Sequence, residues 1–486
     1  MSSGGERFTS RWGLIVSVLG IAVGTGNIWR FPRIAAANGG GSFLIPWVIF
    51  LFLWSIPLIM AEFAIGKSTR HGTVGAFARL MGERFTWMGL FVGFVASAIM
   101  FYYSVVTGWC FRYLLLAATG QLFQIADYTG DWNHFTLSGW QPIIFHFLAI
   151  SFGVWIISRG VVAGIERTNR LLIPTLLILI VVSAIRAVTL PGALEGLNYL
   201  FTPRLDGLLD YRVWLHALTQ NAWDTGAGWG LILTYAVYMR EREDVPLNAA
   251  LIGLGNNSVS LLAGITVFCT VFALMPSRAM EIATSPGPAN TGLTFIWIPQ
   301  LFEQMVGGAF FCLLFFLALS FAALSSLISL LELAVRILMD LKISRQTALM
   351  VVYLVGFTAG LPSALSQDFF VNQDWTWGIA LMISGLFVAL AVLVRGVEDF
   401  RNRDINSPGS DLHIGRWYDW IIRVAIPVQV IVLVLWWFWQ AMIAGPDDWW
   451  NPFRIESVGT CLFQWGIVLI VFLMINRRVA TRTLKK

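Results

Sequence analysis

Residues 20–32 read GIAVGTGNIWRFP, and they interrupt a stretch that is otherwise strongly apolar. Three glycines, Asn27 and Arg30 stand where a simple membrane anchor would carry leucine and valine. In hydrocarbon every backbone amide needs a hydrogen-bond partner, so a helix that faces lipid is rarely broken. Broken backbone at membrane depth is tolerated where it lines an enclosed cavity, and there it can hold an ion or a polar solute. The stretch therefore predicts a membrane helix that is interrupted around a binding site.

The composition is that of an all-α integral membrane protein. Of the 486 residues 57% are hydrophobic and 12% are charged, whereas a soluble protein carries about 25% charged residues. The 23 Trp and 36 Phe suit helix surfaces that face lipid and the aromatic belts at the two interfaces. The basic residues are spread over short loops, which indicates membrane lipid as a partner and no nucleic acid. The four cysteines lie in apolar stretches without metal-binding or disulfide spacing, so we interpret them as packing residues: Cys110, Cys269, Cys312 and Cys461.

About twelve apolar runs approach the length needed to cross a bilayer, which takes roughly 20 helical residues. An even number of spans puts both termini on one side of the membrane. If that side is the cytoplasm, most of the 32 Lys and Arg fall in cytoplasmic loops, as the positive-inside rule requires. We therefore expect a multi-pass protein of the plasma membrane, the inner membrane of a bacterium, with both termini in the cytoplasm. The runs are 12–36, 42–66, 87–117, 141–158, 169–189, 213–238, 247–275, 304–338, 346–361, 376–394, 418–443 and 457–475.

A second interruption occurs in the sixth run, where residues 220–230 read QNAWDTGAGWG. The two interruptions are five spans apart. Glycine-broken spans at corresponding positions of two halves indicate an inverted-repeat transporter with its binding site near the bilayer midplane. We therefore predict one transporter domain over residues 1–486, made of a first repeat at 12–189, a second at 213–394, and two further spans at 416–476.

Several motifs resemble the neurotransmitter:sodium symporter family over nearly the whole chain. The most specific is GTGNIWRFP at 24–32, followed by NGGG at 38–41; the sixth-span break, Leu324-Ser325-Ser326 and Asp374 also match. The resemblance, to the bacterial amino-acid-transporting branch, implies the leucine-transporter-type fold with two five-helix inverted repeats. It also implies sodium-driven uptake of an amino acid or an amine.

The resemblance implies two sodium sites, each built partly from the carbonyls of unwound backbone. For Ser325 and Ser326 an alternative stays open, because serine hydroxyls inside helices commonly hydrogen-bond to the backbone of their own helix. The first site would use Ala22, Asn27, Asp224, Asn256 and the substrate carboxylate. The second site would use Gly20, Val23, Ala322, Ser325 and Ser326.

The family's chloride site is altered in this chain. Gln220 and Ser260 match it, but Trp47 replaces a tyrosine and Asp224 replaces a hydroxyl residue. A fixed carboxylate can supply the negative charge that two sodium ions need in a low dielectric, so we expect that chloride is not required. The alternative is a protonated Asp224 that only hydrogen-bonds broken backbone.

The substrate site implied by the family lies between the two interruptions. Amine-transporting members carry an aspartate at the position of Gly24, so a glycine there favours a substrate that brings its own carboxylate, an amino acid. Trp229 is bulkier than the phenylalanine common at its position, and Gly226 leaves room near the amine, which favours glycine, alanine or an N-methyl glycine. The expected binding residues are Ala22, Gly24, Gly26, Ile99, Tyr103, Trp223, Gly226, Trp229, Ser326 and Leu330.

Charged residues match the two gates of the family. Arg30 and Asp374 match the outer ion pair, and Asp340 matches the acid of the inner gate, for which Arg7 with Phe8 is the nearest partner in the sequence. The spacing from Gly164 to Pro174 resembles a hinge in span five, although an ordinary proline kink explains it equally well. In the family the buried acids Glu62 and Glu332 brace unwound backbone; the five histidines receive no role.

We thus expect a sodium-coupled symporter that imports a small neutral amino acid by alternating access, with two sodium ions and no need for chloride. The sequence contains no constellation typical of a membrane enzyme. The alternatives are a carrier of larger neutral amino acids, a proton-coupled carrier, and a substrate-gated channel or sensor. The oligomeric state is open.

Overall fold

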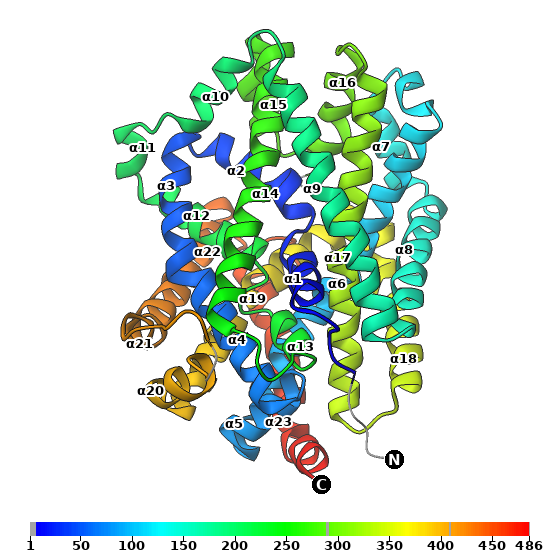
Figure 1. The fold of residues 1–486 in the computed structure, drawn as a ribbon. Coiled ribbons are helices and arrows are strands. Elements are labelled where there is room, and N and C mark those ends of the chain that lie inside the picture. The colour runs from blue at the N-terminus through cyan, green and yellow to red at the C-terminus, as the bar shows by residue number, and fades with distance from the viewer. Residues whose placement is uncertain (1–5, 288–290, 408–409, 486) are drawn as a thin grey trace.

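The computed structural model describes residues 6–287, 291–407 and 410–485 and is helical throughout, with no β-strand in these ranges. Long helices run side by side as a bundle, and residues 6–10 reach the same end of the bundle as the end of α23 (Val458–Leu484) (Figure 1). The predicted all-α membrane fold is confirmed. Which membrane face holds the termini stays a prediction, as do the repeat boundaries.

Ten continuous helical segments of the described chain are long and apolar enough to cross a membrane. One bent pair of helices forms a further span, and α12 (Tyr211–Asp224) with α13 (Leu231–Ala236) occupies the predicted sixth span in two shorter pieces. The described chain therefore has ten such segments, or eleven with the bent pair, and the expected twelfth span, at α12 and α13, consists of pieces that are each too short to cross a membrane alone. The ten segments are Gly41–Thr69, Glu83–Ala118, Trp140–Ser158, Val161–Val188, Val245–Leu274, Gly308–Asp340, Arg345–Leu365, Gln367–Arg395, Trp417–Ala444 and Val458–Leu484.

The helices of these segments keep the labels of Figure 1. Short helices lie between them and cap the bundle on both ends (Figure 1). The spanning helices are α1 (Arg11–Ala22), α2 (Phe31–Ala37), α3 (Gly41–Phe50), α4 (Ile56–Thr69), α6 (Thr86–Ala118), α8 (Trp140–Ser158), α9 (Arg167–Val188), α14 (Val245–Leu274), α17 (Gly308–Asp340), α18 (Arg345–Leu365), α19 (Gln367–Arg395), α22 (Ile426–Ala444) and α23. The connecting helices are α5 (Thr73–Met81), α7 (Tyr128–Leu137), α10 (Ala193–Phe201), α11 (Leu205–Leu209), α15 (Ala279–Thr284), α16 (Ile298–Glu303) and α20 (Val397–Phe400). Helix α21 (Trp417–Trp420) is the start of the span that continues into α22.

The first span is broken where the sequence predicts. Helix α1 ends at Ala22, and Val23 leaves the helix with φ −79° and ψ 92°. One turn of π-helix at Gly26–Arg30 then leads into α2, and the two halves are bent by 54°. The side chain of Asn27 reinforces the break, because its Oδ1 accepts the backbone N–H of Gly24 at 2.8 Å. The carbonyls at the end of α1 are therefore free to bind something other than the next helical turn.

The second break depends on glycine. Between α12 and α13, Gly226, Gly228 and Gly230 have φ values of +69°, +87° and +77°, a region that other residues rarely adopt. Glu62 on α4 stabilises this stretch from the side: Oε1 accepts the N–H of Gly228 at 2.7 Å and of Gly230 at 3.2 Å, and Oε2 accepts that of Leu233 at 2.9 Å. The buried acid thus replaces the hydrogen bonds that a continuous helix would make.

Span five is continuous in this structure. A single π-turn at Val161–Glu166 runs directly into α9, and Pro174 lies inside that helix without interrupting it. Of the two alternatives for the Gly164–Pro174 spacing, the structure shows no unwound hinge within Val161–Val188.

Candidate functional site

A cavity of about 380 Å³ lies between the two broken spans. The two breaks, α6, α17 and α19 line it, and its lining also includes Arg30, Trp437 and Glu456. All ten residues predicted to bind substrate line it. That they do bind substrate stays a prediction. The ten are Ala22, Gly24, Gly26, Ile99, Tyr103, Trp223, Gly226, Trp229, Ser326 and Leu330.

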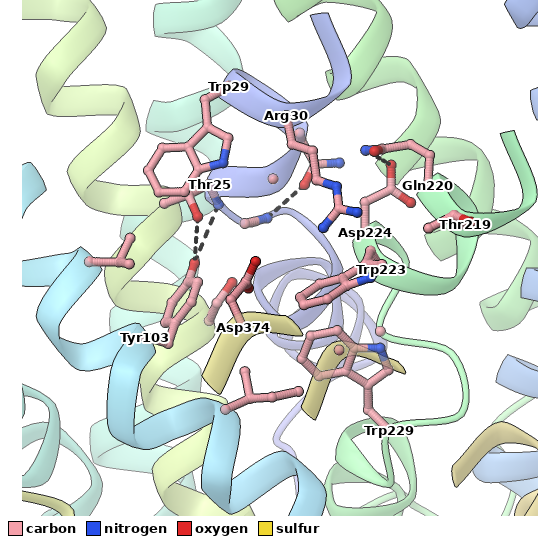
Figure 2. Close-up of a pocket in the computed structure, with 18 of the residues that line it drawn as sticks. Thr25, Trp29, Arg30, Tyr103, Thr219, Gln220, Trp223, Asp224, Trp229 and Asp374 are labelled. Carbon is pink, nitrogen blue, oxygen red and sulfur yellow. Dashed lines mark hydrogen bonds between the residues drawn. The ribbon is translucent and has the colours of Figure 1, made fainter. Parts of the chain in front are cut away.

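Tyr103 anchors the first break to α6. Its hydroxyl oxygen accepts from the N–H of Thr25 at 3.3 Å and from the Thr25 hydroxyl at 3.2 Å (Figure 2). Because both bonds use the oxygen as acceptor, the hydroxyl proton of Tyr103 is left to donate into the cavity. A Cβ on Gly24 would lie 2.9 Å from Ser326 Oγ and 3.3 Å from the Tyr103 hydroxyl, so a side chain at position 24 would crowd this donor.

Two tryptophans form one wall of the cavity. The indole N–H of Trp229 donates to the carbonyl of Ala222 at 3.0 Å, which fixes the ring in one orientation. Trp223 lies edge-on to it at a centroid distance of 6.1 Å, and the guanidinium of Arg30 covers Trp223 at 4.5 Å (Figure 2). The volume beside Gly226 is therefore bounded by bulky side chains that are held in place.

Oxygen atoms gather around Asn256 on α14, where the first sodium site is predicted. The Asn256 side-chain amide lies 3.0 Å from the carbonyl of Ala22 and 3.1 Å from the carbonyl of Asp224. If the amide nitrogen of Asn256 points toward the two carbonyls, it can donate to both. If the amide oxygen points toward them, the three atoms form a cluster of oxygens. Asn27 Nδ2 donates to Asn256 Oδ1 and to Ser260 Oγ, both at 2.8 Å, which favours the second orientation. In that orientation three oxygens face one another, and oxygens are the ligands that a hard cation prefers, so the residues present fit a sodium ion.

Asp224 lies at the end of α12 and is 5% exposed. Its Oδ2 accepts from Gln220 Nε2 at 3.2 Å (Figure 2), whereas Oδ1 has no hydrogen-bond partner in the described chain. Ser260, the other residue of the predicted anion-replacing group, contacts Asn27. Trp47 is buried and lies beside Phe31.

The predicted second sodium site lies where α17 meets α1. Ser326 Oγ donates across to the carbonyls of Gly20 and Ile21 at 3.3 and 3.5 Å, which brings the two helices together. Ser325 Oγ instead donates to the carbonyl of Ala322 at 3.0 Å. This is the bond to its own helix that the alternative for the serines predicts. The structure brings Gly20, Ser325 and Ser326 together; ion binding by this group, with Val23 and Ala322, stays a prediction.

The outer gate residues face the cavity without pairing. Arg30 lies over Trp223, its Nε has no hydrogen-bond partner, and the described residues include no ion pair between Arg30 and Asp374 (Figure 2). Both side chains line the cavity together with Trp437 and Glu456.

The inner gate differs from the pairing that the sequence suggested. Arg7 pairs with Glu241 at 3.3 Å, not with Asp340. Asp340 is buried and accepts the N–H groups of Gly72 at 3.1 Å and Gly75 at 2.9 Å, with His71 Nδ1 at 3.4 Å. The reason is that the chain reverses before α5 and presents the free N–H groups of its first turn to the acid.

Other buried groups also depart from expectation. Phe8 packs against Tyr235 and Tyr238. Glu332 does not brace broken backbone; it pairs with Arg345 at 2.7 Å and accepts from the Tyr238 hydroxyl. Sequence reasoning gave no role to His71 or to Asn169, since neither belongs to a motif and only the fold brings each to its neighbours.

Three comparisons with known proteins agree with this geometry. A model of the protein family described as "Sodium:neurotransmitter symporter family" matches residues 5–134 and 139–481. An uncharacterized sodium-dependent transporter of Methanocaldococcus jannaschii is 32% identical over 459 residues, which cover 88% of this chain and 89% of that protein. The uncharacterized sodium-dependent transporter YhdH of Bacillus subtilis is 29% identical over 447 residues, covering 88% and 97%. The crystal structure of MhsT in complex with L-phenylalanine matches with a TM-score of 0.79 and 30% identity, over 89% of this chain and 99% of MhsT.

Proposed function

Because the chain belongs to the sodium:neurotransmitter symporter family, we propose that it imports a small neutral amino acid with two sodium ions and without chloride. Membership makes it a multi-pass membrane protein and a sodium-dependent symporter. The observation that carries the proposal is the cavity between two broken spans, with a cluster of backbone and side-chain oxygens at one edge.

The main-chain end of the substrate would bind at the breaks. Gly26 has open space around its Cα, so its backbone can be approached closely, and the Tyr103 hydroxyl has a proton to donate. A carboxylate bound there would receive these hydrogen bonds and lie near the N-terminal end of the outer half-helix, whose dipole favours negative charge. The absence of a side chain at Gly24 leaves no acid to pair with an amine-only substrate.

A small side chain is favoured by the tryptophan wall. Turning Trp229 away to admit a longer substrate would break its hydrogen bond to Ala222, so the position that it holds favours a small substrate. At position 226 even a Cβ would lie 2.9 Å from Ile21 Cγ2, closer than van der Waals contact, so the cavity is tight beside this glycine. Glycine, alanine and N-methyl glycine fit these limits.

A larger neutral amino acid is the second candidate. MhsT, which matches this chain in fold, holds L-phenylalanine in its crystal structure. The cavity beyond the tryptophans continues outward, so a longer side chain has volume available if Trp229 turns.

Chloride independence is supported by Asp224. Its carboxylate is buried beside the oxygen cluster, and one of its oxygens has no hydrogen-bond partner among the described residues. An ionised carboxylate there balances cation charge in a low dielectric, as a bound chloride would otherwise do.

Transport in purified proteoliposomes tests the proposal. Uptake of radiolabelled glycine, alanine, N-methyl glycine, leucine and phenylalanine is compared in sodium and in choline, with and without an imposed pH gradient. We expect sodium-dependent uptake of the small substrates that survives replacement of chloride by gluconate. Uptake driven by protons in choline would identify a proton-coupled carrier, and current without stoichiometric uptake would identify a channel.

A further inference from the structure

Asn169 is a fully buried polar side chain whose amide has no partner. It lies in the first turn of α9 and is 0% exposed, and neither its Oδ1 nor its Nδ2 makes a hydrogen bond within the described ranges. Buried polar side chains are nearly always hydrogen-bonded, so a side chain with both ends free calls for an explanation.

The amide lies against the predicted second sodium site. A Cβ built on Gly20 would be 3.1 Å from Asn169 Oδ1 and 3.2 Å from the Cβ of Ser325. The Asn169 oxygen, the backbone of Gly20 and the Ser325 side chain therefore meet at one point between α9, α1 and α17. The carbonyl of the same Gly20 accepts from the hydroxyl of Ser326 at 3.3 Å.

Amide oxygens are suitable ligands for a hard cation. The apolar side chains that fill most of this core offer no hydrogen bond to a buried amide oxygen. Gly20 also has a reason to be a glycine here, because a side chain would occupy the space next to the amide. A cation bound here would give the Asn169 oxygen the partner that it lacks.

We propose that Asn169 supplies a further oxygen, directly or through one water molecule, to a sodium ion held by Gly20, Val23, Ala322, Ser325 and Ser326. This inference rests on the proposed sodium-coupled function. It adds a third helix to the site, since α9 joins α1 and α17 there. Sodium binding then stabilises the packing of α9 against α1, and release of the ion removes that contact, so the position of α9 depends on occupancy of the site.

The test measures sodium binding rather than transport. Purified full-length protein in detergent, without substrate, is titrated with sodium while its thermal stability and its binding of radioactive sodium are recorded. Asn169→Leu keeps nearly the same volume and removes the oxygen, and we expect it to raise the half-saturating sodium concentration about tenfold. Asn169→Asp keeps an oxygen at the same position and should bind sodium at least as tightly as the wild type.

Asn248→Leu is the matched control. Asn248 is also fully buried with an unpartnered Nδ2, but it lies in the first turn of α14 and its Oδ1 accepts from Arg11. Its substitution should leave sodium affinity unchanged. The inference is overturned if Asn169→Leu stays within twofold of the wild type, or if Asn169→Asp is weakened as much as Asn169→Leu; Asn169→Ala is read the same way should the leucine variant not fold. A wild type that shows no response to sodium refutes the proposed function itself.

Discussion

Glu62→Gln is the substitution whose effect follows most directly from the geometry of the second break. The two carboxylate oxygens of Glu62 accept three backbone N–H groups, those of Gly228, Gly230 and Leu233. A glutamine has one acceptor oxygen. If the glutamine oxygen takes the position of Oε1, it keeps the bonds to Gly228 and Gly230. The glutamine NH₂ group then faces the N–H of Leu233, so that two donors oppose each other.

The size of the effect can be worked out from these bonds. A hydrogen bond to a charged group contributes about 1.5–3 kcal/mol, and a buried N–H left without an acceptor costs a similar amount. We therefore take about 2 kcal/mol as the free energy by which Glu62→Gln destabilises the binding-competent conformation of the break. Because each 1.4 kcal/mol is a factor of ten, and because apparent affinity falls with the competent fraction, the substrate Kd should rise about 30-fold.

Equilibrium binding of radiolabelled substrate at saturating sodium measures this, with thermal stability recorded on the same samples. Glu332→Gln serves as the comparison, because Glu332 is equally buried but bonds to Arg345 and Tyr238 and does not line the cavity. It should lower stability with little change in Kd. If Glu62→Gln binds substrate within threefold of the wild type, the three N–H bonds do not hold the binding-competent break, and our reasoning fails.

Three other predictions concern the cavity and the gates. Trp229→Phe should improve the affinity for leucine relative to alanine about tenfold or more, since one methylene in a pocket is worth roughly 10–200-fold. Competition binding measures this preference, with the exposed Trp439→Phe as control. An unchanged preference would show that the Trp229 indole does not limit substrate size. Asp224→Ser should make uptake depend on chloride, with a loss of at least about tenfold in gluconate because a buried compensating charge is gone; equal uptake in both anions by this variant contradicts the role. Asp340→Ala leaves two N–H groups of the α5 turn without their acceptor, at a cost of about 1–3 kcal/mol each. It should therefore raise the labelling rate of a cysteine introduced on the cytoplasmic path. An unchanged labelling rate would exclude Asp340 from the gate.

The sequence was most informative where local chemistry leaves few choices. Gly226, Gly228 and Gly230 predict a break because their backbone conformations are nearly closed to other residues, and the polar stretch around Asn27 predicts the other break because lipid does not tolerate it. The predicted repeat then leads us to expect the two breaks face to face around a shared cavity.

What the sequence could not provide are the partners that depend on loop geometry and on packing between distant helices. Asp340 binds the turn before α5 because that turn reverses toward α17, and no pattern near Arg7 or His71 predicts it. The position of Arg30 over Trp223 is one side-chain conformation among several that the same residues allow. Asn169 resembles an ordinary core residue in the sequence, because its contact with Gly20 arises only when α9 packs against α1.

The contacts around Asn256 give a physical reason why sodium and substrate should bind together. Asn27 fixes the first break through Gly24 and reaches Asn256, and Asn256 in turn faces the carbonyls of Ala22 and Asp224, one from each break. With the Asn256 oxygen turned inward, these oxygens repel one another, and a cation bound between them would stabilise the two breaks at this distance. A substrate that spans the same breaks requires that distance, and a sodium ion lowers the free energy of reaching it. By linkage the substrate would raise sodium affinity by the same factor that sodium raises substrate affinity, so we expect the coupling to originate in the shared geometry of the breaks, with no separate signalling pathway.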